Sequence, residues 1–571
     1  MTERRSNSRI RLLVVGFALV FLVALGKAAW IQVIDGRAYE AMASRQHRQK
    51  IEIPAGRGTI YDRTGEPLAI GEQATTVYAD PRNVTAPMKA AVKAATTLGL
   101  DPDEVYPSLR DRSKRFVFVD RKADPVKAAA LQKLGVAGIG FYPEERRTYP
   151  QGRVASHLLG FAGTDNKGLD GLEQSLDRAL AGKPGYEIVV RDPAGQAIDV
   201  VTSLKERPGR NVVLTLDHQI QANAEQILAN AVARWRAKGA TAIVMDPSTG
   251  AILAMANAPT FDANRFTSAA PEARRNRAVT DLYEPGSTFK IVTVAAALED
   301  NIVAPDTSFW LQPTIRVADR VIREAHTRGA ERMTVRQILS ESSNIGTITI
   351  AQKLGGSELA SWVDRFGFGR KTGSELPGES PGIVLPYGRW SGSTIGTVPI
   401  GQGIAVTPLQ MVSAYAAIGN GGVMPPAHVV AKVGGKKVRH GKSRRVVSRH
   451  TADRMTAMFR DVVVEGTGTE AAIPGYTVAG KTGTANKPEN GVYVQKYVAS
   501  FVGLVPARKP RLAILVMVDE PHGQIWGGVV AAPVFRDIAR FTLQYLEVPP
   551  DAPESKRSSS MLAAGARGST Q

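Results

Sequence analysis

Residues 284–298 read Glu-Pro-Gly-Ser-Thr-Phe-Lys-Ile-Val-Thr-Val-Ala-Ala-Ala-Leu, a turn signal followed by an almost unbroken apolar run. The run predicts a buried helix that begins at or just before Ser287. Ser287 and Lys290 are three residues apart, so they share one face of that helix. Free N–H groups and the helix dipole at this N-terminus favour a negative charge that develops near Ser287.

This pair of residues suits nucleophilic catalysis. A serine hydroxyl is a poor nucleophile until a base takes its proton. Lys290 can be that base only when it is neutral, and burial together with a second cation lowers the pKa of a lysine. We expect Lys481 to be that cation. The alternative is a helix-capping serine beside a surface lysine, but this is the chain's only Ser-x-x-Lys and its lysine interrupts an apolar run.

A second motif is Ser342-Ser343-Asn344. The hydroxyl of Ser342 can pass a proton, and Asn344 can offer its carbonyl oxygen to a lysine and its N–H to a substrate carbonyl. Serine and asparagine are also common in caps and turns, and the motif alone favours that role. Followed by Lys-Thr-Gly, however, the two motifs form the signature of acyl-transfer enzymes whose serine is activated by lysine.

The third motif, Lys481-Thr482-Gly483-Thr484, has a decoy at Lys371-Thr372-Gly373. The decoy lies among glycines and polar residues that are typical of a loop. Lys481 instead follows the strand-like run at 476–480. We therefore assign the chemistry to Lys481 and interpret Lys371 as structural.

Strand-like runs at 497–505 and 511–518 follow the third motif. Together with the motif they predict an antiparallel sheet whose edge carries Lys481. Gly480 and Gly483 have no Cβ, so we expect a substrate to lie directly against the backbone of this edge.

Composition limits the classes of function. The 571 residues suffice for more than one domain, and the absence of cysteine excludes thiol nucleophiles, disulfides and cysteine–metal sites. The net charge of +19 would suit an anionic cell wall or a lipid-linked pyrophosphate substrate. Basic residues are scattered and not interleaved with aromatics, so we expect no nucleic-acid partner. The sequence has no zinc-ligand spacing, and we expect no metal or cofactor.

The N-terminus predicts a membrane location. Residues 12–34 are predominantly apolar, and a helix over them would span about 35 Å, enough to cross a bilayer. The preceding tail, residues 1–11, carries four arginines against one glutamate. The positive-inside rule keeps this tail cytoplasmic and sends the rest outside the inner membrane as a single-pass protein. A cleaved signal peptide is the alternative, but no clear Ala-x-Ala cleavage site follows.

Residues 36–208 mix strand-like runs with polar helices, among them a helix at 124–134 and a strand at 186–191. No catalytic constellation stands out there. We interpret this part as a pedestal or dimerisation-type module that binds partners. Residues 548–571 are rich in Pro, Ser, Gly and Ala, and they predict a disordered tail.

Residues 209–547 hold all three motifs. The part opens with a strand at 212–216, and Asp217 is placed to cap the helix that follows. Runs at 242–245 and 251–255 predict a hairpin. A long helical stretch separates this hairpin from the strands after residue 476, so the fold class is α/β, with an antiparallel sheet assembled from both ends of the domain.

Taken together, the chain resembles the class B penicillin-binding proteins, which are peptidoglycan D,D-transpeptidases. Within that family it is most similar to the division-specific (septal, FtsI-like) branch. The resemblance covers nearly the whole chain. Beyond the three motifs, the segments that carry it are 57–63, 65–69, 168–173, 245–250, 259–262, 401–403, 407–410 and, for the septal branch, 527–535.

The resemblance implies the penicillin-recognising serine transpeptidase fold, an antiparallel sheet flanked by helices with a helical subdomain, behind a transmembrane helix and an elongated α+β pedestal. It implies that Ser287 attacks a stem peptide ending in D-Ala-D-Ala and that β-lactams acylate the same serine. Lys290, Ser342, Asn344 and Lys481 would be catalytic. Thr482, Gly483 and Thr484 would bind substrate, and the backbone N–H groups of Ser287 and Thr484 would form the oxyanion hole.

The resemblance also implies partners: peptidoglycan stem peptides, a lipid-linked precursor, β-lactams, the membrane, a septal glycosyltransferase and other division proteins. Several alternatives stay open at this point. An elongation-type transpeptidase, a D,D-carboxypeptidase, a β-lactamase, a β-lactam sensor and a β-lactam-binding division scaffold share parts of the pattern. Transfer of the acyl group to water in place of an amine would separate the hydrolases from a transpeptidase.

Overall fold

The computed structural model describes residues 2–33, 48–191 and 197–552. The chain divides into two compact units. The first comprises Met1–Gly56 and Gly182–Gly209, and the second comprises Arg57–Ala181 and Arg210–Gln571. Residue 34 of the predicted membrane span, residues 36–47 of the predicted pedestal and residues 553–571 of the predicted tail lie outside the described residues.

The first unit contains a long apolar helix and a small sheet. The helix α1 (Thr2–Val33) includes the stretch Ile10–Gln32, which has a mean hydropathy of 2.4 and no part buried by protein. A helix that is apolar all round and this long can cross a bilayer, so a suitable helix lies where the sequence predicts one. The antiparallel sheet has the order β1-β6-β7, with β1 (Arg48–Ile53), β6 (Gly185–Arg191) and β7 (Ala197–Leu204). The strand predicted at 186–191 is confirmed as β6.

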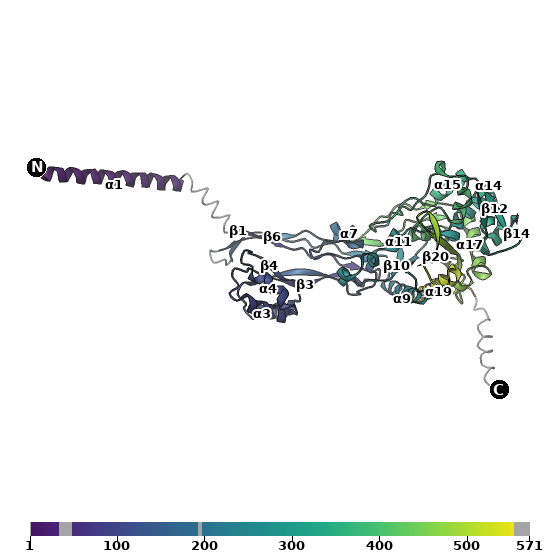
Figure 1. Ribbon diagram of the computed structural model, residues 1–571, viewed down its shortest axis with the longest axis horizontal. Helices are drawn as coiled ribbons and strands as arrows, with labels where there is room; N and C mark the ends of the chain where they lie inside the picture. Colours follow the sequence, from purple (N-terminus) through teal and green to yellow (C-terminus); the bar gives the residue numbers. More distant parts are fainter. Residues whose placement is uncertain (1, 34–47, 192–196, 553–571) are drawn as a thin grey trace, which may run out of the picture. The chain divides into compact units, whose positions relative to one another are not determined.

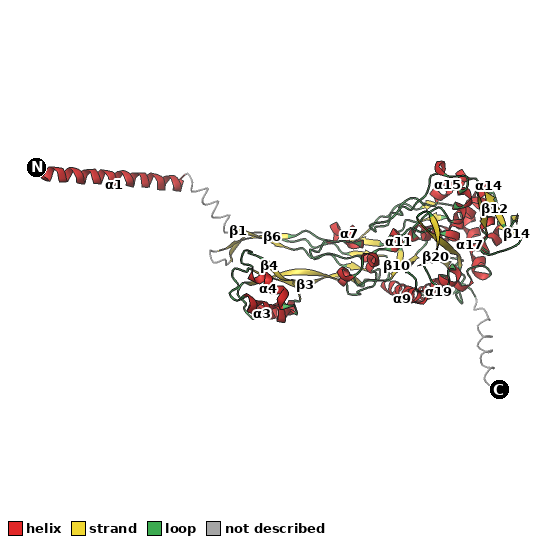
Figure 2. Cartoon of the chain, in the orientation of Figure 1, coloured by secondary structure: helices red, strands yellow, loops and turns green. Residues whose placement is uncertain are grey.

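In the second unit, β3 (Pro67–Ala79) organises the N-terminal part (Figures 1 and 2). It pairs with β2 (Ile60–Tyr61), β4 (Val117–Ala123) and β5 (Ile139–Thr148). The helices of this part are α3 (Pro87–Leu98), α4 (Pro102–Arg110), α5 (Pro125–Lys133), α6 (Ser156–Leu159), α7 (Gly171–Ser175) and α8 (Asp177–Leu180). The helix predicted at 124–134 is confirmed as α5, and its cap, Asp124, accepts the N–H groups of Val126 and Lys127.

The same sheet continues into the chain that precedes the catalytic part. β2 pairs in parallel with β8 (Val212–Leu214), which pairs with β16 (Val430–Val433) and through it with β17 (Lys436–Lys437). The predicted strand at 212–216 therefore ends two residues early, because Thr215 and Leu216 bond to other segments: Thr215 N–H donates to Val429 O, and Leu216 O accepts from Arg63 N–H.

A cluster of buried ion pairs joins the segments 57–63 and 168–173. Arg57 Nη2 lies 2.6 Å from Glu173 Oε2, and Arg147 Nε lies 2.6 Å from Glu173 Oε1. Arg57 also bonds Asp177 at 2.8 Å. Arg57 belongs to the 57–63 segment and Glu173 to the 168–173 segment, so the two segments are joined by charge across 116 residues of sequence.

The catalytic part is built on an antiparallel sheet with the order β10-β9-β21-β20-β19. Its strands are β9 (Gly239–Met245), β10 (Ile252–Ala258), β19 (Ala479–Glu489), β20 (Val492–Val505) and β21 (Leu512–Asp519). The predicted hairpin is β9–β10, the strands predicted at 497–505 and 511–518 lie in β20 and β21, and β19 is the edge strand that carries the third motif. All three predictions are confirmed.

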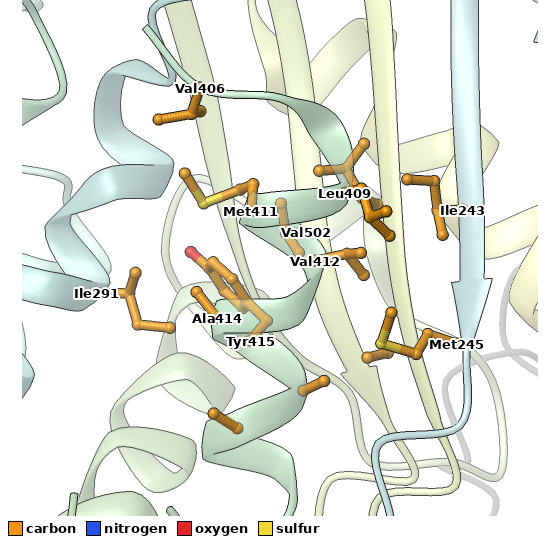
Figure 3. Packing of buried hydrophobic residues seen from close by; sticks show 14 of the residues in the cluster. Ile243, Met245, Ile291, Val406, Leu409, Met411, Val412, Ala414, Tyr415 and Val502 are labelled. Carbon is orange, nitrogen blue, oxygen red and sulfur yellow. The ribbon is translucent and has the colours of Figure 1, made fainter. Parts of the chain in front are cut away.

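Alternating side chains of β9 face two different cores, as the period of a strand requires. Ala242 and Val244 pack in one core with α9 (His218–Trp235) and α19 (Ala532–Tyr545). Ile243 and Met245 pack in the other, against α16 (Pro408–Gly419), as Figure 3 shows. Helices therefore cover both faces of the sheet. Asp217 caps α9 as predicted, accepting the N–H groups of Gln219 and Ile220.

A helical region lies between β10 and β19, as the sequence predicts. Its α-helices are α10 (Pro271–Arg274), α11 (Arg277–Thr280), α12 (Lys290–Glu299), α13 (Val335–Ser340), α14 (Asn344–Leu354), α15 (Gly356–Arg365), α16 and α17 (Arg449–Val464). Short strand pairs that the sequence analysis does not predict interrupt it: β11 (Ser308–Leu311) with β14 (Glu331–Thr334), β12 (Thr314–Val317) with β13 (Arg320–Arg323), and β15 (Val423–Met424) with β18 (Arg444–Arg445).

Two predicted boundaries need correction. Residues 476–478 are not part of the strand: Tyr476 and Thr477 bond instead to Val548 and Asp551, so β19 begins at Ala479 and runs through the Lys-Thr-Gly motif. For the same reason the predicted tail does not begin at 548. Val548 is buried in the core beside α19, and the chain stays attached through Asp551.

Candidate active site

Ser287 lies on a 3₁₀ turn, Gly286–Phe289, directly before α12. The predicted helix therefore starts at Lys290, and Ser287 sits in the tighter turn ahead of it. Neighbouring contacts fix the turn: Gly286 N–H donates to Gly401 O at 3.1 Å, and the buried hydroxyl of Tyr415 donates to Thr288 O at 2.9 Å. Residues 288–290 are buried, whereas Ser287 is half-buried and lines a cavity of about 400 Å³.

Lys290 brings the first two motifs together. Its side chain is fully buried, and Nζ donates to Ser342 O at 2.5 Å and to Asn344 Oδ1 at 2.9 Å, with Ser342 Oγ at 3.3 Å. Both Ser342 and Asn344 also line the cavity. Within the described residues, Lys290 thus bonds to the second motif and not to Ser287, so direct proton exchange between Ser287 and Lys290 stays a prediction.

The second motif combines a structural and a chemical role. Ser343 caps α14 by accepting the N–H of Gly346 at 2.9 Å. Ser342 adopts the left-handed region with φ +62°, which is uncommon for a residue with a side chain. This backbone lets Ser342 and Asn344 turn towards Lys290 while the residue between them holds the helix.

Lys481, on the edge strand β19, is also fully buried. Its Nζ lies 3.3 Å from Thr482 O and 3.4 Å from Thr482 Oγ1. Thr482 and Thr484 line the cavity, and Thr484 Oγ1 accepts the N–H of Gly527 at 3.0 Å. The decoy residue Lys371 is exposed and is not among the residues that line this cavity.

The two glycines of the third motif make room for the protein's own atoms. A Cβ on Gly483 would lie 2.4 Å from Ser500 Oγ and 3.0 Å from Pro285 O, and one on Gly480 would lie 2.5 Å from the ring of Phe501. The edge strand is thus packed tightly against the turn that carries Ser287. Close packing explains these glycines, and the role of Gly483 in substrate binding stays a prediction.

Burial gives the two lysines unusual acidity. Burial lowers the pKa of Lys290 to about 7, while the carboxylate of Glu324 raises this pKa and the guanidinium of Arg328 lowers it. Burial and then the charge of Lys290 lower the pKa of Lys481 well below its ordinary value. The sequence analysis expects Lys481 to be the cation that acts on Lys290. The charge of Lys290 lowers the pKa of Lys481, so the two amines act on each other, and the expected effect of Lys481 on Lys290 stays a prediction. Arg328 is a further cation that lowers the pKa of Lys290.

One wall of the cavity comes from a loop that the sequence analysis does not identify. Glu324 accepts the Ser343 hydroxyl at 2.5 Å and the Asn344 N–H at 2.7 Å. Arg328 bonds Glu341 at 3.2 Å. The ring of His326 lies 4.6 Å from that of Trp526, which also lines the cavity. No motif marks these residues, because their position relative to Ser342 depends on the short strand pairs that hold the loop.

Among the described residues, one group has the geometry of a metal site: Asp62, Asp217 and His218 offer ligand atoms within 4.8 Å of one another. Most of the oxygens in this group already have partners within the protein, and Asp217 Oδ2 lies 3.5 Å from Arg63 Nη1. Asp62 accepts from His218, Thr64 and Glu66, and Asp217 caps α9. We therefore interpret the group as part of the fold, and none of its members lines the cavity.

Comparisons with known proteins agree with this geometry. The family described as "Penicillin binding protein transpeptidase domain" matches residues 240–540, and the "Penicillin-binding Protein dimerisation domain" matches residues 52–214. The chain is 35% identical over 544 residues to the peptidoglycan D,D-transpeptidase FtsI of Escherichia coli strain K12, covering 94% of this chain and 91% of that protein. It is also 35% identical to the stage V sporulation protein D of Bacillus subtilis, covering 93% and 85%.

The fold is similar to solved structures of the same kind. The crystal structure of penicillin-binding protein 3 from Mycobacterium tuberculosis, complexed with aztreonam, matches with a TM-score of 0.70 and 31% identity. The match covers 88% of this chain and 99% of that one.

Proposed function

Because the chain belongs to the penicillin-binding protein transpeptidases, we propose that it is a membrane-anchored peptidoglycan D,D-transpeptidase whose nucleophile is Ser287. The observation that carries the assignment of residues is the meeting of three motifs at one cavity. Ser287, Ser342, Asn344, Thr482 and Thr484 line it, and the buried amines of Lys290 and Lys481 contact Asn344 and Thr482 of this lining.

Acylation is the first half of the reaction. Ser287 Oγ attacks the carbonyl carbon between the last two D-alanines of a donor stem peptide, and its proton passes to neutral Lys290. The hydroxyl of Ser342 gives a proton to the leaving amine and recovers one from Lys290, which lies 3.3 Å away. The carbon–nitrogen bond breaks, D-alanine leaves, and an ester on Ser287 remains. A lysine pKa of about 7 suits this work, since a base is most effective when its pKa is near the operating pH.

Transfer completes the crosslink. The amine of an acceptor strand attacks the ester carbonyl, an amide bond forms, and the amine's proton returns to the serine oxygen. The N–H groups of Ser287 and Thr484 stabilise the oxyanion in both halves, and the loss of one such donor typically raises the barrier by about 3 kcal/mol. Lys481 and the hydroxyls of Thr482 and Thr484 bind the terminal carboxylate. A β-lactam enters the same path, but its amine stays tethered after ring opening, so the ester persists.

The assignment of Ser287 can be tested by intact-protein mass after exposure to benzylpenicillin. We expect the wild type to gain the mass of one β-lactam and Ser287→Ala to gain none. Ser268→Ala, which removes an exposed serine outside the cavity, is the matched control and should acylate like the wild type. A persistent mass gain in Ser287→Ala would refute the assignment. Crosslinked dimers, as opposed to trimmed monomers, in a stem-peptide assay separate a transpeptidase from a carboxypeptidase.

We further propose a single-pass topology with residues 1–11 in the cytoplasm, the span at residues 12–34, a pedestal at 36–208 and a transpeptidase domain that begins at residue 209. Because Val548 is buried and Asp551 bonds to Thr477, this domain extends past residue 547 before the C-terminal tail begins. The arginines before α1 support this orientation. The chain has no cysteine, so Ser8→Cys and Ser391→Cys each give a single reporter. In intact cells stripped of their outer barrier, a membrane-impermeant maleimide should label Ser391→Cys and not Ser8→Cys. The reverse pattern would contradict the proposed orientation.

The septal role and its partners rest on resemblance. We propose that the anchor and pedestal bind a septal glycosyltransferase and other division proteins. Replacement of residues 1–35 with an unrelated membrane span should abolish co-purification of a glycan polymerase while β-lactam acylation is retained. Unchanged co-purification would count against the role of the anchor.

A further inference from the structure

A second hollow lies in the second unit, away from the residues of the proposed active site. Its volume is about 570 Å³, within the range of small-ligand sites. It lies where the segment matched by the dimerisation family meets the segment matched by the transpeptidase family, a kind of junction that often holds ligands. The lining residues are Arg121, Lys122, Arg146, Arg147, Thr148, Ala162, Gly163, Thr164, Asn264 and Phe266.

The charged residues that line this hollow are all cations. Carboxylates pair with three of them from outside the lining: Glu144 with Arg121 at 2.6 Å, Glu72 with Arg146 at 3.0 Å, and Glu173 with Arg147 at 2.6 Å. Asp165, which is exposed beside the lining residue Thr164, also pairs with Arg121 at 2.7 Å. The lining itself contains four cations and no carboxylate.

Arg147 is the residue whose hydrogen bonding is incomplete. Its side chain is 2% exposed, and its Nε bonds to Glu173. Both of its terminal nitrogens, Nη1 and Nη2, are buried without a hydrogen-bond partner in the described structure. Buried donors are nearly always paired, and an unpaired one costs about 1–3 kcal/mol, more when it is charged. Two unpaired nitrogens on one guanidinium indicate that an acceptor belongs beside them.

The neighbouring residues Arg121 and Lys122 also have N–H groups without an acceptor. Arg121 bonds through Nη1 and Nη2, but its Nε is buried without a partner. Lys122 is buried, bonds Asn166 through one of its three N–H groups, and takes the left-handed backbone with φ +59°. A residue with a long side chain rarely adopts this backbone conformation, and Lys122 does so at a position where it lines the hollow.

We propose that this hollow is an anion site that binds a phosphate group. Three of the side chains that line it, Arg121, Lys122 and Arg147, have N–H groups without an acceptor in the described structure. A phosphate offers three or four acceptor oxygens on a tetrahedron and suits such an arrangement better than a planar carboxylate, and guanidinium groups match phosphate geometry. The phosphate of a lipid headgroup and a free phosphate have this chemistry in common.

The test measures binding of inorganic phosphate to the full chain in detergent by isothermal titration calorimetry. We expect saturable binding to the wild type and a dissociation constant at least tenfold larger in Arg147→Lys, which keeps the charge beside Glu173 but lacks the free Nη groups. Lys122→Gln, which leaves the Arg57–Glu173–Arg147 cluster intact, should weaken binding similarly. Arg82→Gln, which removes an arginine paired with Asp80 outside the hollow, is the matched charge control and should bind like the wild type.

Lipid competition, the Ser287→Ala variant and acetate competition complete the test. Competition by phosphatidylglycerol in the micelle, and not by phosphatidylcholine, would assign a lipid source, and binding of inorganic phosphate alone would assign a free one. Ser287→Ala should bind phosphate normally, so the site can stand even if the proposed catalytic serine is wrong. Absence of saturable binding, wild-type affinity in both Arg147→Lys and Lys122→Gln, or equal competition by acetate would overturn the proposal.

Discussion

Two groups of buried charged residues in the second unit have opposite surroundings. In the pedestal part, Arg57 and Glu173 have side chains that are 1% and 0% exposed and lie in contact, with Arg147 on the other carboxylate oxygen. Beside the active-site cavity, Lys290 and Lys481 are both fully buried. Among the described residues no carboxylate bonds to either amine, and their partners are hydroxyl, carbonyl and amide oxygens.

The pKa values show what this difference means. Burial alone lowers the pKa of each cation. At Arg57 burial lowers the pKa, but the carboxylates of Glu173 and Asp177 together outweigh burial, and the pKa is raised. At Lys290 burial prevails and lowers the pKa to about 7, and at Lys481 burial together with the charge of Lys290 lowers the pKa well below its ordinary value. Paired charge fixes a fold, whereas unpaired like charge makes a proton easy to remove, and such groups gather at functional sites.

The largest effect expected from this comparison is on Lys290. Lys290→Met should reduce the rate of acylation by benzylpenicillin roughly 10²–10⁴-fold, the usual contribution of a general base. The fold should be retained, because methionine removes a buried cation that has no carboxylate partner. Stopped-flow acylation and thermal unfolding measure the two effects. Lys371→Met, the lysine of the decoy motif, should change neither; an equal loss in both variants would place the chemistry elsewhere.

The opposite outcome is expected at the paired cluster. Glu173→Ala leaves Arg57 and Arg147 buried without their shared carboxylate and should destabilise the second unit by about 3–5 kcal/mol. Molecules that remain folded should acylate at the wild-type rate, because Glu173 does not line the active-site cavity. Denaturant titration is the measurement. Glu72→Ala, which breaks the half-exposed pair with Arg146, should cost no more than about 1 kcal/mol, and a comparable loss there would contradict the role of burial.

A third carboxylate tests whether hydrogen bonds can replace an ionic partner. Burial raises the pKa of Asp62, but hydrogen bonds from His218, Thr64 and Glu66 outweigh it and lower the pKa to about 2. A lowered pKa means that the ionised form stabilises the fold above the ordinary value of 3.8 and that this stability is lost as pH falls towards 2. Asp62→Asn should therefore cost about 1–3 kcal/mol at pH 7.

The difference between Asp62→Asn and the wild type should shrink as the pH falls through this window, which unfolding measured from pH 7 to pH 2 would follow. Asp453→Asn, at an exposed helical position, should change stability by less than about 0.5 kcal/mol at every pH. A pH-independent difference at Asp62 would mean that its shape, and not its charge, matters.

The contrast between the clusters also explains what the sequence could predict. Ser287 with Lys290 and Ser342 with Asn344 are set by chemistry at short spacing, so their motifs identify them. The pair Arg57–Glu173 is separated by 116 residues, and nothing local indicates it except the two segments that carry its members. Glu324 lies in a loop 20 residues before Asn344 and has no motif at all. The parallel pairing of β2 with β8 is equally non-local.

The sequence also contains a signal for the turn that ends the edge strand. Asn490-Gly491 is a strong hairpin signal, and both residues have positive φ in the turn between β19 and β20. A turn at these two residues predicts that the edge strand extends to Glu489, as β19 does. The sequence cannot predict whether Gly483 makes room for a substrate or for the protein itself, because both cases give the same sequence pattern. The structure shows Pro285 and Ser500 in the space that a Cβ would occupy.

The smallest expected effect tests how the unpaired lysine is tuned. Burial sets the low pKa of Lys290, the carboxylate of Glu324 raises it and the guanidinium of Arg328 lowers it. Glu324→Gln should therefore lower this pKa, and the rise of the acylation rate with pH should move to lower pH. Arg328→Gln should move it to higher pH. Because the pKa of Lys290 is already about 7, a shift of one unit would at most about double the neutral fraction at pH 7 in Glu324→Gln and would reduce it roughly fivefold in Arg328→Gln.

Opposite shifts from these two substitutions distinguish electrostatic tuning from a structural effect, because simple disorder of the loop at 324–330 would lower the rate at every pH in both variants. Glu324 also accepts the Ser343 hydroxyl and the Asn344 N–H, and glutamine can still accept one of them, so part of the support for α14 survives in Glu324→Gln. Acylation rates from pH 5 to pH 9 give the profiles. Shifts in the same direction would mean that Lys290 takes its acidity from burial alone and that the two cavity-wall charges serve the fold, as Arg57 and Glu173 do.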